Sequence, residues 1–302
     1  MILIYKLIDF ITIETLEGKA IYFMIIGGFS FAAMGALTHG LGKYMDWAVI
    51  ALFRMIFSFI VTYSWAARSG KKPLVLNRAL LWVRCIIGSI AMLATFYSLT
   101  MLPVSDVSVI TETRPIWVAL LAAVYLGEKN TKYIWISMIL GLVGVLLIEK
   151  PHFEERNFAV FAALFASLLG AVVMICLRKL RDLDSRTIVT QFSGTASIIA
   201  FTFILFFRDL SEVAKIVDPK VIIMIIGIGV FGTLGQLAMT KAFALGKAST
   251  VSTAGLLKVG FSAGFDVLIW NYVFKSSTIL GMILILGSTT LLFRKSNNIK
   301  TR

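Results

Sequence analysis

The sequence predicts an all-helical membrane protein with ten transmembrane helices, arranged as two inverted halves of five helices. Three observations predict this class. The 302-residue chain is 59% hydrophobic and has a mean hydropathy of +0.91, far outside the range of soluble proteins. Apolar runs of about 20 residues, the length that a helix needs to cross a bilayer, recur along the whole chain. A sequence pattern also repeats between the fourth and the ninth of these runs.

Ten apolar runs account for most of the chain, and short breaks that contain charges, glycine or asparagine separate them. Because the runs are long and show no strict alternation, they are not the strands of a β-barrel. They extend over Ala20–Gly42, Trp47–Ala67, Ala79–Met101, Val104–Leu126, Tyr133–Ile148, Phe158–Leu177, Thr187–Phe207, Val221–Phe243, Ser249–Phe274 and Thr278–Phe293.

The net charge of +13 reflects topology rather than nucleic acid binding. If the N-terminus is cytoplasmic, 17 Lys and Arg residues fall on the cytoplasmic side of the membrane and 7 on the opposite side. Positive charge concentrates on the cytoplasmic side, so we predict that both termini are cytoplasmic and that the chain lies in the inner (cytoplasmic) membrane. The basic side also favours contact with anionic membrane lipid, whereas no basic domain is available to bind nucleic acid.

The two ends of the chain carry weaker signals. Acidic residues interrupt residues 1–19 and no cleavage site follows, so this segment is either an interfacial helix or an unstructured leader rather than a signal peptide. Residues 294–302 form a basic tail that we place in the cytoplasm. Cys85 and Cys176 stand alone in apolar runs and only two histidines occur, so we predict no disulfide, no metal site and no cofactor.

The internal repeat divides the chain into halves. The stretch "SDVSVITETRPIWVA" in the fourth run matches "STVSTAGLLKVGFSA" in the ninth, with Ser105 on Ser249 and Arg114 on Lys258, at an offset of 144 residues. This offset implies five helices per half, over residues 20–150 and 158–293. Because five is odd, the second half enters the membrane inverted, as in secondary transporters, whose substrate site lies near the midplane between the halves.

Over nearly its full length the chain resembles the drug/metabolite transporter superfamily, in particular its EamA-type members. The most specific stretch, Val83–Lys129, runs from an arginine through "FYSL", "LPVSDV" and "RPIW" to "LGEK", and "ALFRMIFS" and "GLVGVLLI" are similar too. The resemblance implies ten helices in two inverted halves and alternating access for a small organic solute. Two features depart from the family pattern: "TETRP" replaces a neutral Ser or Thr before the proline, and Trp270 and Asn271 replace "GE" in the second half.

Glu112 and Arg114 stand close to mid-bilayer in the fourth run, where a charge costs about 2.5–3.5 kcal/mol on insertion scales. Pro115 removes a backbone donor, so we expect a kink or break beside these charges. Irregular backbone at membrane depth lines a cavity or is buried in protein. Two residues apart, Glu112 and Arg114 point to opposite sides of a regular helix, so they reach one cavity only if Pro115 distorts the backbone.

Two interpretations of the intramembrane charges remain open. In the first, Arg114 and Lys258 are pseudo-symmetric cations that attract a carboxylate or phosphate across a central cavity. Glu112 and Asp266 are then counter-charges, proton-coupling sites or contacts for a substrate amine. In the second, the charges form a static salt bridge, for example Arg114 with Asp266, that holds the fourth helix against the ninth.

Three further cations have two interpretations each. Arg54 matches an arginine of the family and either lines the cavity or a gate, or forms a structural pair. Arg84 and Lys241 lie within about two turns of the cytoplasmic interface, so we expect them to extend to the headgroups, with a gate or pairing role as the alternative for Arg84.

Three uncharged residues are weaker candidates for substrate binding. Gln236 contacts the solute, or the glycines beside it simply permit close helix packing. Tyr97 and Trp117 stack on a planar substrate, or they pack within the membrane as most aromatic side chains do.

Together these features predict a secondary transporter that moves a small polar or zwitterionic metabolite, amino-acid-like or S-adenosylmethionine-like, by alternating access. Five intramembrane cations against two anions favour a substrate with a carboxylate, and protons are a candidate coupling ion. The alternative is a proton-coupled exporter of drugs or toxic metabolites with the same fold. The sequence has no HExxH, GxSxG, filter-like segment or P-loop, which argues against an enzyme, a channel and an ATP-driven pump, and it makes no prediction of oligomeric state.

Overall fold

The computed structural model describes residues 15–42, 44–101, 104–149, 157–207, 219–270 and 276–298. Within these ranges all regular secondary structure is helical, which confirms the predicted all-helical class. In the same ranges, seven helices are long and apolar enough to cross a membrane, and three shorter apolar helices accompany them at Ala79–Thr95, Lys132–Ile148 and Ser276–Leu292.

The helix boundaries follow the ten predicted apolar runs closely. The helices are α2 (Leu16–Leu41), α3 (Trp47–Arg68), α4 (Ala79–Met101), α5 (Val104–Thr111), α6 (Arg114–Leu126), α7 (Lys132–Glu149), α8 (Asn157–Lys179), α9 (Ser185–Phe207), α10 (Pro219–Leu245), α11 (Ala248–Ala254), α12 (Leu257–Trp270) and α13 (Ser276–Asn298). Residues 1–14 of the predicted leader and 299–302 of the predicted tail lie outside the described residues. The remaining parts of both segments join α2 and α13.

Local sequence explains several of these boundaries. The hydroxyl of Thr15 accepts a hydrogen bond from the backbone N–H of Gly18 at 3.0 Å and so caps the start of α2. The carboxylate of Asp46 caps α3 in the same way, by accepting from the N–H of Ala48 at 2.8 Å. Gly127 ends α6 in the left-handed conformation, with φ 63°, which glycine adopts without a steric penalty.

The fourth predicted run is broken into α5 and α6 at residues 112–113. Pro115 has no N–H to donate to the carbonyl of Thr111 one turn earlier, and that carbonyl instead lies 3.4 Å from the hydroxyl of Ser167 on α8, which donates to it. The hydroxyl of Thr113 donates to the carbonyl of Ile110 at 2.5 Å, which turns the chain between the two helices. The expected distortion beside Pro115 is therefore a break that a neighbouring helix stabilises.

The ninth predicted run is also broken, between α11 and α12 at residues 255–256. No proline occurs here. The backbone closes instead through tighter turns, in which the N–H groups of Leu256 and Lys258 donate to the carbonyls of Thr253 and Gly255, at 3.2 and 3.1 Å. The two breaks lie 143 residues apart, within one residue of the predicted offset of 144. The repeat that the sequence contains is thus also a repeat of backbone geometry.

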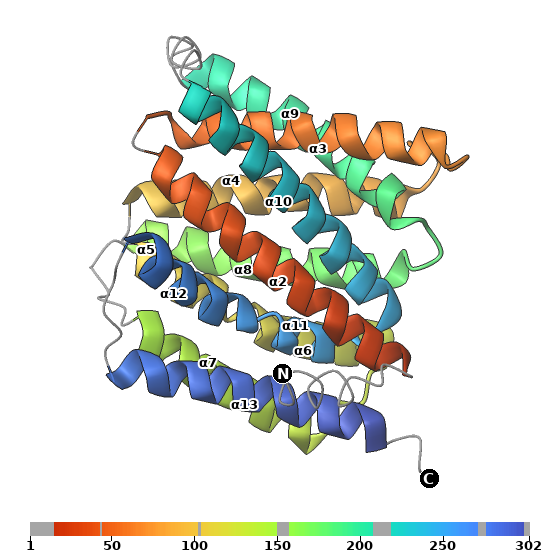
Figure 1. The fold of residues 1–302 in the computed structure, drawn as a ribbon. Coiled ribbons are helices and arrows are strands. Elements are labelled where there is room, and N and C mark those ends of the chain that lie inside the picture. The colour runs from red at the N-terminus through yellow and green to blue at the C-terminus, as the bar shows by residue number, and fades with distance from the viewer. Residues whose placement is uncertain are drawn as a thin grey trace, which may run out of the picture.

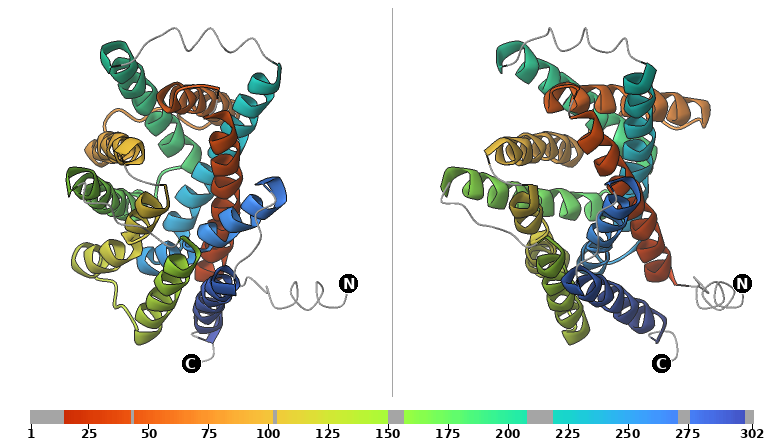
Figure 2. Two further views of the ribbon diagram at one scale, coloured as in Figure 1. Left: turned by 90° about the vertical axis from the view of Figure 1, so that its left-hand side faces the viewer. Right: turned by 60° about the vertical axis from the view of Figure 1, so that its left-hand side comes forward.

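Helix packing follows the same twofold pattern. The first helix of one half packs against the third of the other, so that α2 lies on α10 and α8 lies on α4. Likewise, α12 packs on α2 and α6 packs on α8. The second helices, α3 and α9, pack together, and so do the fifth helices, α7 and α13. In Figure 1, α2 and α10 run side by side, α3 and α9 lie at one end, and α7 and α13 lie at the other. Figure 2 shows the same arrangement from two further directions.

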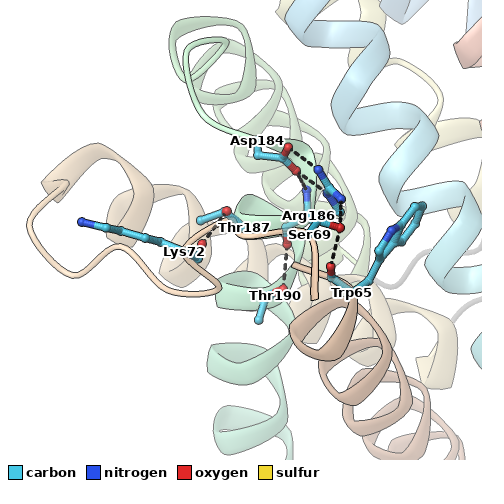
Figure 3. Close-up of polar contacts among 7 residues, drawn as sticks. All are labelled: Trp65, Ser69, Lys72, Asp184, Arg186, Thr187 and Thr190. Carbon is cyan, nitrogen blue, oxygen red and sulfur yellow. Dashed lines mark hydrogen bonds and ion pairs between the residues drawn. The ribbon is translucent and has the colours of Figure 1, made fainter. Parts of the chain in front are cut away.

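The helices α3 and α9, the second helices of the two halves, run antiparallel. Along α3 and α9, hydroxyl contacts join Ser58 to Ser193 at 3.1 Å and Thr62 to Thr190 at 2.9 Å, so residue numbers rise on one helix as they fall on the other. Near the end of α3 the series continues with the guanidinium of Arg186, which donates to Ser69 at 2.6 Å (Figure 3). In a lipid environment such polar side-chain contacts hold helices together.

Candidate functional site

The two helix breaks face a central cavity of about 520 Å³. It lies where α2 and α10 meet the interrupted helices. Each break contributes one residue to its lining, Glu112 from the first and Gly255 from the second. Five of the predicted site residues that carry polar or charged side chains line the cavity: Arg54, Glu112, Arg114, Gln236 and Lys258. Methionine and phenylalanine side chains line much of the rest: Met24, Phe31, Met34, Met174, Met239 and Phe243. A mostly apolar wall with a few convergent polar groups, at this volume, suits a small organic molecule.

An ion pair crosses this cavity wall between the two halves of the chain. The Nζ of Lys258, at the start of α12, donates to Oε1 of Glu112, in the break between α5 and α6. The side chain of Glu112 is 10% exposed and that of Lys258 is 34% exposed, so the carboxylate is the more deeply buried partner. A salt bridge between the fourth and ninth predicted helices thus exists. It joins Glu112 to Lys258, not the Arg114 and Asp266 of our example, and both of its residues line the cavity.

Arg114 reaches the same cavity as Glu112, as expected once the helix is interrupted before Pro115. Its Nε is buried without a hydrogen-bond partner, and no side chain that the structure describes forms an ion pair with its guanidinium. The side chain lies against Gly170 of α8, where a Cβ would stand 2.5 Å from Nε. The absence of a side chain at residue 170 therefore makes room for this cation. Asp266, the partner that we named as an example, lies on α12 with its side chain outside the described part of the structure.

A smaller side cavity of about 270 Å³ adjoins the central one, and Arg54 and Arg114 line both. Arg84 of α4 lines the side cavity only. The guanidinium carbon of Arg84 lies 3.8 Å from the ring centroid of Phe192 on α9, and Arg84 is 0% exposed. Arg54 has a weaker contact of this kind with Phe31, at 5.9 Å. The cations thus line two adjoining cavities.

The expectation that Arg84 extends to the headgroups is wrong, because the residue is completely buried. Its direction is set by Phe192, which belongs to a helix of the other half and offers the face of its ring to the cation. Lys241, for which we made the same prediction, is exposed, and its Nζ lies 5.2 Å from the ring of Phe23. Lys241 lines neither cavity.

Of the three uncharged candidates, one lines the cavities and two do not. Gln236 of α10 lines both cavities. Tyr97 lines neither, and packs edge-on against Phe158 in a separate apolar recess of about 470 Å³. Trp117 lines neither cavity and packs against the largest cluster of buried apolar side chains, where its Nε1 has no hydrogen-bond partner among the described residues. For Tyr97 and Trp117 the packing interpretation fits the structure better than stacking on a substrate.

Sequence reasoning missed the role of Glu128, which follows α6 in the "LGEK" motif. Its carboxylate accepts hydrogen bonds from the N–H of Ala248 at 2.9 Å, from the N–H of Ser249 at 3.3 Å and from the hydroxyl of Ser249 at 3.0 Å. A residue of the first half thereby satisfies the first backbone donors of α11 in the second half. The motif gave a signal for this contact, but its partner lies 120 residues away along the chain and could not be identified from the sequence.

Among the residues that the structure describes, no group of three or more His, Cys, Asp or Glu side chains is placed to hold a metal ion. The chemistry of the two cavities in the described structure is therefore that of guanidinium, ammonium, carboxylate, amide and hydroxyl groups. Such groups bind and orient a polar solute, and they favour anionic groups of the solute because cations predominate.

Known proteins are similar to this chain in sequence and in fold. A sequence model described as the EamA-like transporter family matches residues 18–149 and again residues 157–294. The pseudopaline exporter CntI of Pseudomonas aeruginosa is 26% identical over 273 residues, which cover 89% of this chain and 94% of the exporter. The S-adenosylmethionine uptake transporter of Rickettsia bellii is 25% identical over 86% of this chain and 88% of that protein.

More distant similarities agree with these matches. Human solute carrier family 35 member G1 is 24% identical over 90% of this chain and 78% of its own length. A solved crystal structure superimposes with a TM-score of 0.79 over 93% of this chain and 97% of the other, at 13% identity, which is a likeness of fold. The family and its named members are transporters and not enzymes. Because the family model matches both halves, the chain belongs to the EamA-like transporter family and is a multi-pass membrane transporter.

Proposed function

We propose that the protein is a secondary-active transporter that moves a small polar or zwitterionic organic metabolite through the central cavity by alternating access. The observation that carries this proposal is the Glu112–Lys258 ion pair, which joins the two helix breaks across a cavity of about 520 Å³. Opening such a cavity to one side of the membrane or the other requires the halves to move against each other. Interrupted helices at the substrate site are typical of secondary transporters.

The proposed topology has ten membrane-spanning helices in two inverted halves, residues 20–150 and 158–293, with both termini in the cytoplasm. The antiparallel packing of α3 on α9 supports inversion, because these helices are equivalent in the two halves. The three shorter apolar helices complete the ten. On this topology the chain lies in the inner membrane, with residues 1–19 and the basic tail 294–302 on its cytoplasmic side.

The proposed substrate carries at least one anionic group. Arg54 and Arg114 both face the central cavity, and neither forms an ion pair with a side chain that the structure describes, whereas Lys258 is neutralised by Glu112. Amino-acid-like and S-adenosylmethionine-like metabolites meet this requirement, and relatives named for S-adenosylmethionine uptake support the second class.

A second candidate is a proton-coupled exporter of drugs or toxic metabolites. Glu112 is an acidic group at the cavity wall, and its protonation would release Lys258. The relative named as an exporter supports outward transport. Coupling to protons predicts that transport follows an imposed pH gradient.

The test is counterflow in proteoliposomes that contain the purified protein, with a panel of labelled amino acids, nucleoside-like metabolites and cationic drugs. A carrier shows saturable uptake that internal unlabelled substrate stimulates. We expect Arg114→Ala to weaken substrate binding at least about tenfold, as loss of a charged hydrogen bond does, while the protein still inserts and folds. Glu112→Gln should abolish any stimulation of transport by a pH gradient.

The matched control is Lys241→Ala, which removes an exposed cation that lines neither cavity, and it should transport as the unchanged protein does. Uptake that rises linearly with concentration and ignores internal substrate would indicate a channel instead. Transport at unchanged affinity by Arg114→Ala would show that the central cavity is not the substrate site.

A further inference from the structure

Three arginines and no carboxylate line the side cavity in the described structure. Arg54, Arg84 and Arg114 come from α3, α4 and α6, and the cavity has a volume of about 270 Å³. The remaining polar groups that line it are the hydroxyl of Thr95 and the amide of Gln236. Neither can neutralise a guanidinium, so the space is a concentration of positive charge within a membrane protein.

Arg84 is the most deeply placed of the three. It is 0% exposed, and its Nε and Nη1 are buried without a hydrogen-bond partner. The ring of Phe192, 3.8 Å from the guanidinium carbon, covers one face and attracts the cation, but an aromatic ring accepts no directed hydrogen bond of ordinary strength from the edge of the guanidinium. A buried cation with unfilled donors needs an acceptor from outside the described residues.

Glycines lie beside two of these guanidinium groups. A Cβ at Gly88, one turn along α4, would stand 3.5 Å from Nη1 of Arg84 and 3.1 Å from the Phe192 ring. Gly170 on α8 leaves the corresponding room for Arg114. Arg114 and Arg54 also line the central cavity, so a solute there contacts guanidinium groups that line the side cavity as well.

We propose that the side cavity is a second substrate subsite, which binds an oxyanion group through Arg84 together with Arg54 and Arg114. The substrate is then an organic anion with two separated oxyanion groups, of which one occupies each cavity. Guanidinium forks match the geometry of carboxylate or phosphate oxygens, and three of them around one space favour a group with several acceptor oxygens. This inference rests on the proposed transport function, because it names the substrate class of the same cavity.

Binding of simple anions to the purified protein in lipid nanodiscs tests the proposal. The probes are butyrate, with one carboxylate, succinate, with two, and inorganic phosphate, each titrated at constant ionic strength against the thermal unfolding midpoint. We expect succinate to raise the midpoint more than butyrate does. Arg84→Met should weaken succinate binding at least about tenfold, the loss expected for a charged hydrogen bond, and weaken butyrate binding less, because one carboxylate can also bind at Arg54 and Arg114 in the central cavity. If phosphate alone shifts the midpoint, the bound group is a phosphate.

Lys241→Met is the matched control, since it also removes a cation that contacts an aromatic ring, but outside both cavities. It should retain the succinate response. A second readout separates binding from a structural role. If Arg84 awaits a ligand, Arg84→Met raises the midpoint of the ligand-free protein; if the Phe192 contact is purely structural, the midpoint falls.

Three outcomes would overturn the proposal: equal succinate binding by Arg84→Met and the unchanged protein, a lower ligand-free midpoint for Arg84→Met, or no response of the unchanged protein to any of these anions. The last outcome, combined with saturable counterflow of a neutral or cationic metabolite, would reject the anion subsite and leave the transport function standing. Conversely, Arg84-dependent succinate binding without counterflow would support the subsite and reject transport.

Discussion

Glu112 and Lys258 form an ion pair although 146 positions separate them, and each lies beside the interruption of its own helix. The pair therefore joins the two halves at the points where their backbones are least regular. At both breaks tighter turns replace the regular helical hydrogen bonds, and such interruptions are typical of hinges. An electrostatic link at this position couples a change of helix angle in one half to the other.

The substitutions Lys258→Met and Glu112→Gln should show strong coupling. Removing Lys258 alone leaves a buried carboxylate without its partner, whereas removing both charges leaves no unpaired charge. We expect a coupling energy of about 1–3 kcal/mol in a double-mutant cycle. The measurement is equilibrium unfolding of the two single variants and the double variant in mixed detergent micelles. Simple additivity of the two single effects would mean that the pair contributes no interaction energy.

Gly170→Ala should impair substrate binding through Arg114. The added methyl group would lie 2.5 Å from Nε of Arg114, so the guanidinium has to leave its position in the cavity wall. We expect about a fivefold to tenfold increase in the substrate concentration at half-maximal transport, with a smaller effect on stability. Gly35→Ala is the control, because Gly35 also lines the central cavity but a Cβ there meets no atom within 4 Å. Equal effects of the two substitutions would contradict this account.

Glu128→Ala should destabilise the contact between the halves at the start of α11. It removes three acceptor contacts to Ala248 and Ser249 and leaves buried donors without partners, which costs about 1–3 kcal/mol. Glu17→Ala is the comparison, since Glu17 meets Lys247 at 3.8 Å and the lysine side chain is 40% exposed. A pair of that kind contributes about 1 kcal/mol or less. Thermal unfolding of both variants checks the difference, and equal losses would contradict it.

Much of the fold could be predicted from hydropathy, because a helix in lipid must satisfy its own backbone and therefore needs a continuous apolar run. The first break could be predicted as well, since Pro115 removes a donor in a known place. The break at residues 255–256 has no proline, and its turns include Gly255. Glycine also occurs in many unbroken membrane helices, so it does not by itself predict a break. No break was predicted there.

The site was harder to predict, because the contacts of each cation depend on how distant segments of the chain pack together. The position of Arg84 near one end of its apolar run suggested that its side chain extends to the membrane interface. Instead the side chain contacts the ring of Phe192 on α9, which lies 108 positions away along the chain. The repeat paired Arg114 with Lys258 as equivalent cations, yet only Lys258 meets Glu112. Equivalent positions in two halves share backbone geometry, whereas their ion pairs depend on which acids stand nearby, and the acids are not repeated.

Asp184→Asn should destabilise the protein near neutral pH and have no effect in acid. Arg186 donates two hydrogen bonds to the Asp184 carboxylate, Nε to Oδ1 and Nη2 to Oδ2, each at 2.8 Å, and it also contacts Ser69 on the loop side of α3 (Figure 3). These bonds hold the pKa of Asp184 below its ordinary value of 3.8. A lowered pKa means that the folded state binds the proton less readily than the unfolded state, so the stabilisation is complete above pH 3.8 and is lost as the pH falls through the folded-state value.

Asparagine keeps one acceptor oxygen, which still caps the N–H of Arg186 at the start of α9. Its amide nitrogen replaces Oδ2 and cannot accept from Nη2, so the substitution removes the charge together with that hydrogen bond. We expect a loss of about 1 kcal/mol at pH 7, which shrinks towards zero below about pH 3 as Asp184 itself becomes neutral in the unchanged protein. Thermal unfolding in detergent between pH 7 and pH 3 measures it. Asp182→Asn is the control, because its pair with Arg78 is half-exposed on both sides and should contribute little at any pH. A deficit of Asp184→Asn that stayed constant across this range would show that the carboxylate acts through its shape and not through its charge.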